Sequence, residues 1–263
     1  MTELPKISII TPSLNQGRFI EQSICSVLDQ GYSNVEMIVI DGGSTDATLD
    51  LLKKFEPRIK WISETDTGQA NAINRGIRMA TGEILAYLNS DDYYLPGTFH
   101  LVGEYFRTNP DARWLSGYCR NIDRNGEEIR KGIKLYKNFW LKFASLKILK
   151  VLNFISQPAT FWRRDILNDV GLLDEGLNYT MDYDLWLRIG RLHQLHILRS
   201  ELACFRIHLS SKSGSTDHGQ FDEELMVAGR YSNNWLQVLH QLHRLVTVNV
   251  YKHLPLLGES AGT

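Results

Sequence analysis

Four short apolar segments, separated by helical patterns, constrain the fold of this chain most. Apolar and β-branched residues dominate residues 7–11, 35–40, 59–63 and 84–88, which predicts four buried strands. Helices are expected between them, over residues 18–31, 47–55 and 69–79. Strands that alternate with helices in this way favour an α/β fold whose sheet is mostly parallel, with right-handed crossovers.

Each predicted strand ends in a polar or acidic loop. Asp41, Asp66 and Asp91 follow three of the strands, and Asp91 lies in the stretch Leu88-Asn89-Ser90-Asp91-Asp92. The carboxyl ends of parallel strands share one edge of a sheet, so these acids are expected to gather there. Oxygen ligands of this kind suit Mg²⁺ or Mn²⁺. Taken alone, Asp91 and Asp92 fit a turn or a helix cap equally well.

Residues beyond 96 continue the mixed pattern. Further helices are expected over residues 97–108, 165–170, about 182–189 and 231 to about 255. Strands are expected at residues 114–122, 157–161 and 196–204, and a turn at 123–127. Asp182 falls near the beginning of its helix, where the free amides favour a carboxylate. Taken alone, that position is better explained by an ordinary helix cap.

Residues 133–155 have a distinct composition. Lysines alternate with leucines and aromatic residues, and no acidic residue interrupts them. Such a basic amphipathic stretch is compatible with contact to an anionic lipid surface. An ordinary helix that packs on the core and exposes its lysines is the favoured alternative.

Composition limits the other classes of protein. A chain of 263 residues with 43% hydrophobic residues suits one large domain, here residues 1–215, with a helical extension over 216–263. Residues 1–110 and 111–215 are expected to form the two halves of this domain. A net charge of −1 argues against a nucleic-acid partner. The three isolated cysteines, and the lack of a leader or a membrane-spanning run, favour a cytoplasmic protein with at most peripheral membrane contact.

Four segments together resemble a family 2 glycosyltransferase. They read IITPSLN (9–15), VIDGGSTD (39–46), DTGQANAINRG (66–76) and LNSDD (88–92), and MDYDLW (181–186) stands at the place of the acceptor-side acidic motif. The dinucleotide GxGxxG and P-loop motifs are missing from the sequence. The resemblance implies a GT-A, Rossmann-like fold, with a mostly parallel central sheet flanked by helices and a C-terminal helical tail.

The resemblance also implies a reaction. A family 2 enzyme moves a sugar, with inversion, from a nucleotide-diphosphate sugar to an acceptor hydroxyl, usually with Mn²⁺ or Mg²⁺. The expected acceptor is a glycan or a lipid-linked sugar in cell-surface polysaccharide or glycan assembly. The lysines and aromatic residues of 133–155 would suit a lipid-linked sugar at the inner membrane face. Two other interpretations are a binding or scaffold protein of the same fold, and a sugar-nucleotide pyrophosphorylase, whose Arg- and Lys-bearing loop does not match residues 12–17.

Individual roles follow from the same resemblance. Asp182 matches the catalytic base, Asp91 resembles the metal-binding acid, and His208 resembles a late histidine of the metal or diphosphate site. The implied nucleotide-sugar site comprises Thr11, Pro12, Asn15, Asp41, Asp66, Asn71, Asn89, Ser90 and Asp92. The residues implied for the acceptor or the diphosphate are Gln157, Asp184, Arg206 and Lys212.

Two positions depart from the family pattern. Many relatives have a second acid in the second loop, where it contacts uracil, and this chain has Gly42 instead. That difference argues against a UDP sugar as the donor and leaves GDP and dTDP sugars open. Asn89 replaces the first acid of the metal motif, which predicts a weaker metal site unless Asp92 compensates.

Overall fold

The computed structural model describes residues 3–209, 211–212 and 219–253. Its strands are β1 (Ile7–Ser13), β2 (Val35–Asp41), β3 (Lys60–Ser63), β4 (Ile84–Tyr87), β5 (Tyr93–Tyr94), β6 (Trp114–Ile122), β7 (Thr160–Arg163) and β8 (His196–Arg206). Its α-helices are α1 (Ile20–Leu28), α2 (Thr48–Lys54), α3 (Gln69–Met79), α4 (Thr98–Thr108), α5 (Lys131–Leu141), α6 (Leu146–Leu149), α7 (Leu167–Val170), α8 (Met181–Leu192), α9 (Gly219–Tyr231) and α10 (Asn234–His253). Short 3₁₀ helices are η1 (Gln157–Ala159) and η2 (Arg164–Ile166).

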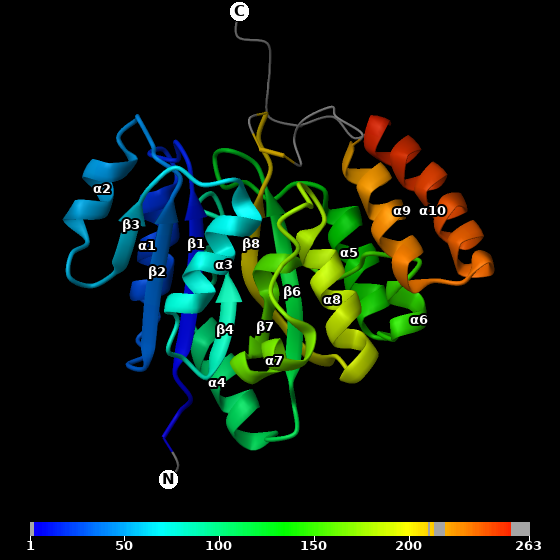
Figure 1. Ribbon diagram of the computed structural model, residues 1–263, viewed down its shortest axis with the longest axis horizontal. Coiled ribbons are helices and arrows are strands. Elements are labelled where there is room, and N and C mark those ends of the chain that lie inside the picture. The colour runs from blue at the N-terminus through cyan, green and yellow to red at the C-terminus, as the bar shows by residue number, and fades with distance from the viewer. Residues whose placement is uncertain (1–2, 210, 213–218, 254–263) are drawn as a thin grey trace, which may run out of the picture.

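All eight strands form one sheet in the order β3-β2-β1-β4-β7-β6-β8-β5. The first four in this order are parallel, as expected from the sequence. β7 then runs antiparallel to both of its neighbours, and β5 runs antiparallel to β8. Helices flank the sheet on both sides (Figure 1). The α/β class and the mostly parallel sheet are therefore confirmed.

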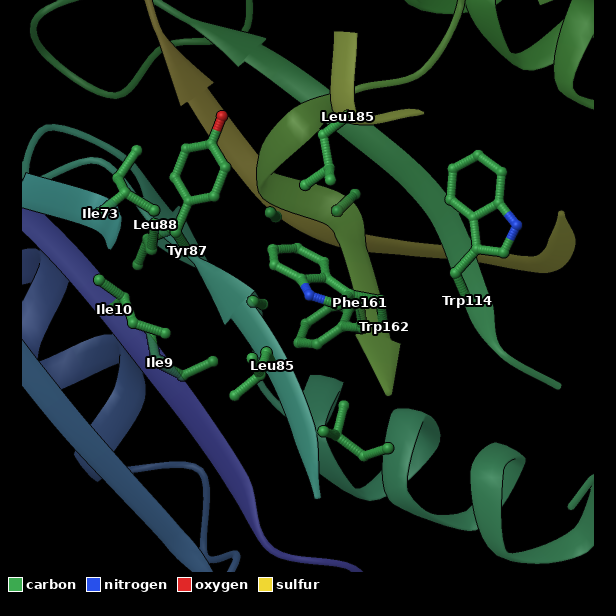
Figure 2. Close-up of a cluster of buried hydrophobic side chains, with 14 of the residues drawn as sticks. Ile9, Ile10, Ile73, Leu85, Tyr87, Leu88, Trp114, Phe161, Trp162 and Leu185 are labelled. Carbon is green, nitrogen blue, oxygen red and sulfur yellow. The ribbon is translucent and has the colours of Figure 1, made fainter. Parts of the chain in front are cut away.

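The centre of the sheet is the main hydrophobic core. Ile9 and Ile10 of β1 lie beside Leu85 and Tyr87 of β4, and Ile73 of α3 lies close to them (Figure 2). α3 approaches β1 closely at Gly76, where a Cβ atom would lie only 2.4 Å from the Ile10 side chain. A glycine at this position therefore lets α3 pack directly on the strand that leads to residues 12–17.

Aromatic packing fixes the second half of the fold. The Trp186 ring on α8 stacks on Trp114 of β6, with ring centroids 5.7 Å apart, and contacts Trp162 of β7 edge-on at 5.4 Å. All three side chains are almost fully buried. This cluster holds α8 against the sheet and so determines where the first turn of α8 lies.

Three features differ from the expectations. Residues 157–159 form a 3₁₀ turn before β7 rather than extended chain, and β5 was not expected. The region after residue 215 contains α9 as well as α10, and α9 packs against α8 (Figure 1). The expected boundary at 215/216 and residues 254–263 lie outside the described residues, so the domain division remains a proposal.

Candidate active site

A cavity of about 570 Å³ opens at the carboxyl ends of β1 and β4. β1 connects to β2 on one side of the sheet, whereas β4 lies on its other side, so the strand order reverses between them. Ligand sites of open α/β sheets form at such a reversal. The cavity walls come from the loops after β1, β3 and β4, from α5 and from the start of α8.

The residues after β4 form a turn that presents Asp91 to the cavity. The Asp92 amide donates to the Asn89 carbonyl at 3.0 Å, which closes the turn. Asn89, Ser90 and Asp91 line the cavity. The turn and the cation site, which the sequence offered as alternatives, are therefore compatible: the turn aims Asp91 at the cavity.

Asp91 and His208 form a pair of candidate metal ligands. His208 Nε2 lies 3.0 Å from Asp91 Oδ2, and both side chains are largely buried. Among the residues that the structure describes, no three His, Cys, Asp or Glu side chains converge on one point. A carboxylate and an imidazole fit a divalent ion that takes its remaining ligands from substrate phosphates and water.

Asp92, which the sequence left as a possible substitute for the acid missing at Asn89, is engaged by the backbone of β8. Its carboxylate is buried and accepts from the Arg206 amide at 2.7 Å. Burial, and next the neighbouring Asp91 carboxylate, raise the pKa of Asp92 well above its ordinary value. The hydrogen bond from the Arg206 amide therefore ties the turn after β4 to the end of β8.

Arg206 was expected to meet the acceptor or the diphosphate, yet its guanidinium is occupied by the chain itself. It donates to the Asp91 carbonyl at 2.8 Å, the Asp123 carbonyl at 3.0 Å and Gln22 Oε1 at 2.6 Å. Although it borders the cavity, Arg206 is only 2% exposed. It therefore fixes the turn that carries Asp91.

The loops after β1 and β2 hold each other in place. Asn15 Oδ1 accepts from the Thr45 amide at 2.9 Å, and Asp41 accepts from the Ser44 amide at 2.8 Å and from Ser63 Oγ at 2.7 Å. Asp41 and Thr11 are fully buried. Contrary to expectation, these side chains lie outside the cavity lining formed by the described residues, whereas Pro12 and Asp66 of the same set line it together with Asn89 and Ser90.

Asn71, the remaining residue of the expected nucleotide-sugar set, also lies outside that lining. Its amide donates to Glu175 at 2.8 Å. Gln69, two residues earlier on α3, lines the cavity instead of Asn71. Gln69 donates to Asn89 at 2.7 Å and accepts from Lys212 at 3.0 Å, so the loop after β8 is tied to the turn after β4.

Asp182 lies in the cavity wall, in the first turn of α8. Its carboxylate accepts from the Tyr183 amide at 2.8 Å. Burial raises the pKa of Asp182, while this hydrogen bond and the positive charge of Lys137 oppose the shift. An acid with a raised pKa beside a cavity is a candidate proton acceptor.

Gln157 and Asp184 were both expected on the acceptor side, and only Gln157 borders the cavity. Its amide donates to the Tyr87 carbonyl at 2.5 Å, and its buried Oε1 has no protein partner among the described residues. Asp184 points away, because it pairs with Arg188 at 2.8 Å and accepts from the Tyr231 hydroxyl at 2.8 Å. Asp184 therefore stabilises the junction of α8 and α9.

Glu223 of α9 shapes the acceptor side and was missed from the sequence. Its carboxylate accepts from three successive amides, those of Asn178, Tyr179 and Thr180, at 2.9, 2.6 and 2.7 Å. These amides precede Asp182. A capping carboxylate normally lies in the same chain segment as its helix, and this one comes from a distant segment, so no local pattern could reveal it.

Glu224, the next residue of α9, belongs to a buried group of titratable side chains. It lies 3.6 Å from His240 of α10, and Lys137 and Asp182 act on it electrostatically. Burial raises the pKa of Glu224 to about 7. This acid is therefore more readily protonated in the folded chain than in the unfolded one.

The raised pKa predicts a loss of stability as the pH rises. In the folded chain Glu224 keeps its proton between its ordinary pKa of 4.5 and a pH near 7. The free energy of unfolding therefore falls across this window, by roughly 3 kcal/mol in total. Glu224→Gln removes the ionisation. Chemical unfolding at several pH values measures the free energy of unfolding of both chains. The value for the variant should rise relative to that of the native chain from pH 5 to pH 8.

Glu21→Gln is the matched control, because it makes the same change at an exposed glutamate of another helix, α1. Its stability should follow the native pH dependence. Parallel curves for Glu224→Gln and the native chain would show that Glu224 ionises normally.

The comparisons with known proteins agree with this geometry. Residues 8–171, more than half of the chain, match the family model described as Glycosyl transferase family 2. An uncharacterized glycosyltransferase of Rickettsia felis is 29% identical over 90% of this chain, and the chain covers 39% of that relative. Chondroitin synthase of Escherichia coli is 27% identical over 73% of this chain, which covers 27% of the synthase. The chain thus spans well under half the length of both relatives.

Solved structures share the fold at low sequence identity. Staphylococcus aureus TarS with UDP-GlcNAc superposes with a TM-score of 0.67 at 17% identity, over 94% of this chain and 71% of that one. The mannosyltransferase PcManGT of Pyrobaculum calidifontis, with GDP-Man and Mn²⁺, gives a TM-score of 0.65 at 16% identity, over 94% and 70%. The matched segments and the fold together establish that the chain belongs to glycosyltransferase family 2 and has the GT-A fold.

Proposed function

We propose that this chain is an inverting glycosyltransferase that moves a sugar from a nucleotide-diphosphate sugar to an acceptor hydroxyl. One observation carries the proposal: the Asp91–His208 pair lies at the edge of the same cavity whose wall contains Asp182. The Asp91–His208 pair suits a metal-bound leaving diphosphate, and Asp182 suits an acceptor hydroxyl. A glycosidase needs neither metal ligands nor a nucleotide site.

Asp182 is the proposed base. The acceptor hydroxyl would donate its proton to the Asp182 carboxylate as the oxygen attacks the anomeric carbon. The bond from this carbon to the diphosphate breaks at the same time, and negative charge develops on the departing phosphate. The ammonium group of Lys212, which borders the cavity, would stabilise that charge.

Asp91 and His208 are the proposed holders of Mn²⁺ or Mg²⁺. A bound divalent ion would supply Lewis acidity to the leaving diphosphate. Arg206 and Gln69 would maintain this arrangement, since Arg206 fixes the Asp91 turn and Gln69 connects Asn89 to Lys212. The GDP-Man and Mn²⁺ bound by PcManGT are consistent with this assignment.

Asp66 is the proposed contact to the nucleotide base. A Cβ atom on Gly42 would lie 2.8 Å from Asp66 Oδ2, so Asp66 occupies the space that an acidic side chain at position 42 would need. The carboxylate lost at position 42 is thereby replaced from the next loop. A carboxylate accepts a hydrogen bond from the ring N–H of uracil, thymine or guanine, whereas the corresponding nitrogen of cytosine carries no hydrogen.

The proposed acceptor is a sugar hydroxyl of a glycan or a lipid-linked sugar, in cell-surface polysaccharide or glycan assembly. Its hydroxyl would lie between Asp182 and Gln157, whose Oε1 is free to accept a hydrogen bond. Chondroitin synthase among the relatives is consistent with a polymer acceptor. Residues 1–110 would then bind the donor and 111–215 the acceptor.

A thermal-shift screen of UDP, GDP, dTDP and CMP sugars with Mn²⁺ tests the proposal. A donor present at about 100 times its dissociation constant stabilises the chain by about 2.7 kcal/mol and raises Tm by several degrees. We expect one of the first three sugars to do so only with the metal present, and the CMP sugar to have no effect. A chain that responds to none of them is not a nucleotide-sugar enzyme.

A further inference from the structure

α10 exposes an apolar stripe along one side. Trp235, Val238, Leu242, Leu245 and Val246 recur at helical spacing, and the side chains of Trp235 and Val246 are 67% and 63% exposed. The opposite side of α10 packs inward, where His240 is 2% exposed and its Nδ1 lies 3.0 Å from the Lys150 carbonyl. A helix with one buried and one exposed apolar side needs a second apolar environment.

α5 adds a second stripe beside the first. Leu135 and Phe139 of α5, and Phe143 just after its end, follow one another at intervals of four residues and are more than half exposed. Tyr136 connects the two helices, because its ring stacks on His243 of α10 and its hydroxyl lies 2.8 Å from His243 Nε2. We call the exposed side chains of these two stripes the α5–α10 surface.

The two chain segments that carry this surface contain basic residues and no acidic ones, although Asp222 of α9 pairs with Arg244 of α10. Residues 129–155 and 234–253 contain no aspartate or glutamate, while Lys131, Lys142 and Lys147 are exposed beside the α5 stripe. Trp235 and Tyr136 add aromatic groups of the kind that favour a membrane–water interface. Apolar side chains flanked by lysines complement an anionic lipid surface in both hydrophobicity and charge.

The surface also lies next to the proposed active site. Ile133 and Lys137 of α5 line the cavity, while Leu135 and Phe139 on the same helix are exposed. α5 therefore separates the cavity from the surface by a single helix thickness. An acceptor embedded in a bilayer that touches this surface would have its head group about one helix away from the cavity lining.

We propose that the α5–α10 surface binds the chain to a bilayer containing anionic lipids, with the apolar stripes among the head groups and the lysines beside lipid phosphates. Membrane binding itself does not depend on the proposed function. Only its purpose, which is to bring the acceptor near the cavity, rests on that function. A second copy of the chain would offer the same lysines and no acidic groups from these helices, so charge disfavours that occupant.

Vesicle co-sedimentation without any donor tests the proposal directly. The native chain should sediment with phosphatidylcholine vesicles that contain phosphatidylglycerol, and much less with phosphatidylcholine alone or at high salt. The double variant Leu242→Glu with Val246→Glu should lower the partition coefficient by about tenfold or more. Leu101→Glu with Leu192→Glu, two exposed leucines outside the surface, should bind as the native chain does.

Native-like thermal unfolding of both double variants would show that they are folded. A native chain that stays in the supernatant at low salt would overturn the proposal. Undiminished binding by Leu242→Glu with Val246→Glu, the α10 variant, would overturn it as well. A native dimer in light scattering that the α10 variant makes monomeric, without vesicle binding, would assign the surface to a second copy instead. Donor stabilisation in the thermal-shift screen is independent of all these outcomes.

Discussion

Asp182→Asn should lower the turnover number by about 10²–10⁴-fold, the usual contribution of a general base. The asparagine amide has nearly the same size, but it cannot take the proton of an acceptor hydroxyl. The donor should bind with an affinity within a few-fold of the native value, because Asp182 lies on the acceptor side of the cavity. Steady-state kinetics and donor titrations of the variant measure the two quantities separately.

The pH dependence of the native enzyme tests the same residue. Asp182 must be ionised to act as a base, so activity should fall as the pH decreases through its pKa. Since burial raises that pKa, the acidic limb should lie above the ordinary aspartate value of about 3.9. The residual activity of Asp182→Asn should lack this limb.

Asp184→Asn is the control for Asp182. It makes the same change two residues later in α8, at a carboxylate bound to Arg188 and Tyr231. We expect it to lower the thermal stability and to leave the turnover of the folded enzyme within a few-fold of native. Near-native turnover of Asp182→Asn, or a larger loss in Asp184→Asn, would remove Asp182 as the base.

Asp91→Ala should abolish the effect of Mn²⁺ on donor binding. Loss of an outer-shell partner already costs about 10–100-fold in metal affinity, and a direct ligand should cost at least as much. His208 would remain, but without the carboxylate charge beside it. Calorimetric titration of the donor, with Mn²⁺ and with a chelator, should give the same weak affinity under both conditions.

Asp92→Asn is the matched control for this metal site. Asp92 is buried, and its raised pKa favours the neutral acid, which an asparagine resembles closely. We expect the variant to keep its response to Mn²⁺. If Asp92→Asn loses that response while Asp91→Ala retains it, the ligand assignments are reversed.

The sequence was sufficient for the α/β class, for the first four strands and for the positions of two of the strand-end acids. Alternation of apolar runs with helical patterns predicted the four parallel strands, and the strand-end rule predicted that Asp66 and Asp91 would meet at one edge. Both line the cavity. Asp182 was placed at the start of a helix by its neighbours Leu185 and Trp186, and α8 begins one residue before it.

Other positions depended on packing that no local pattern contains. Asp41 was expected to meet the base, but Ser44 and Ser63 satisfy its carboxylate inside the loop. α9 was missed because Gly219–Tyr231 carries only a weak apolar pattern, and its function depends on Glu223 and Glu224 reaching α8. Long-range hydrogen bonds of this kind become visible only in three dimensions.

Release of nucleoside diphosphate from UDP-GlcNAc, GDP-Man or a dTDP sugar tests the central claim most directly. With Mn²⁺, the native chain should release the diphosphate from one of these donors, slowly without an acceptor, and a chelator or Asp91→Ala should stop the release. Release that is unaffected by chelation and by Asp91→Ala would contradict the assignment of a metal-dependent transferase site to this cavity.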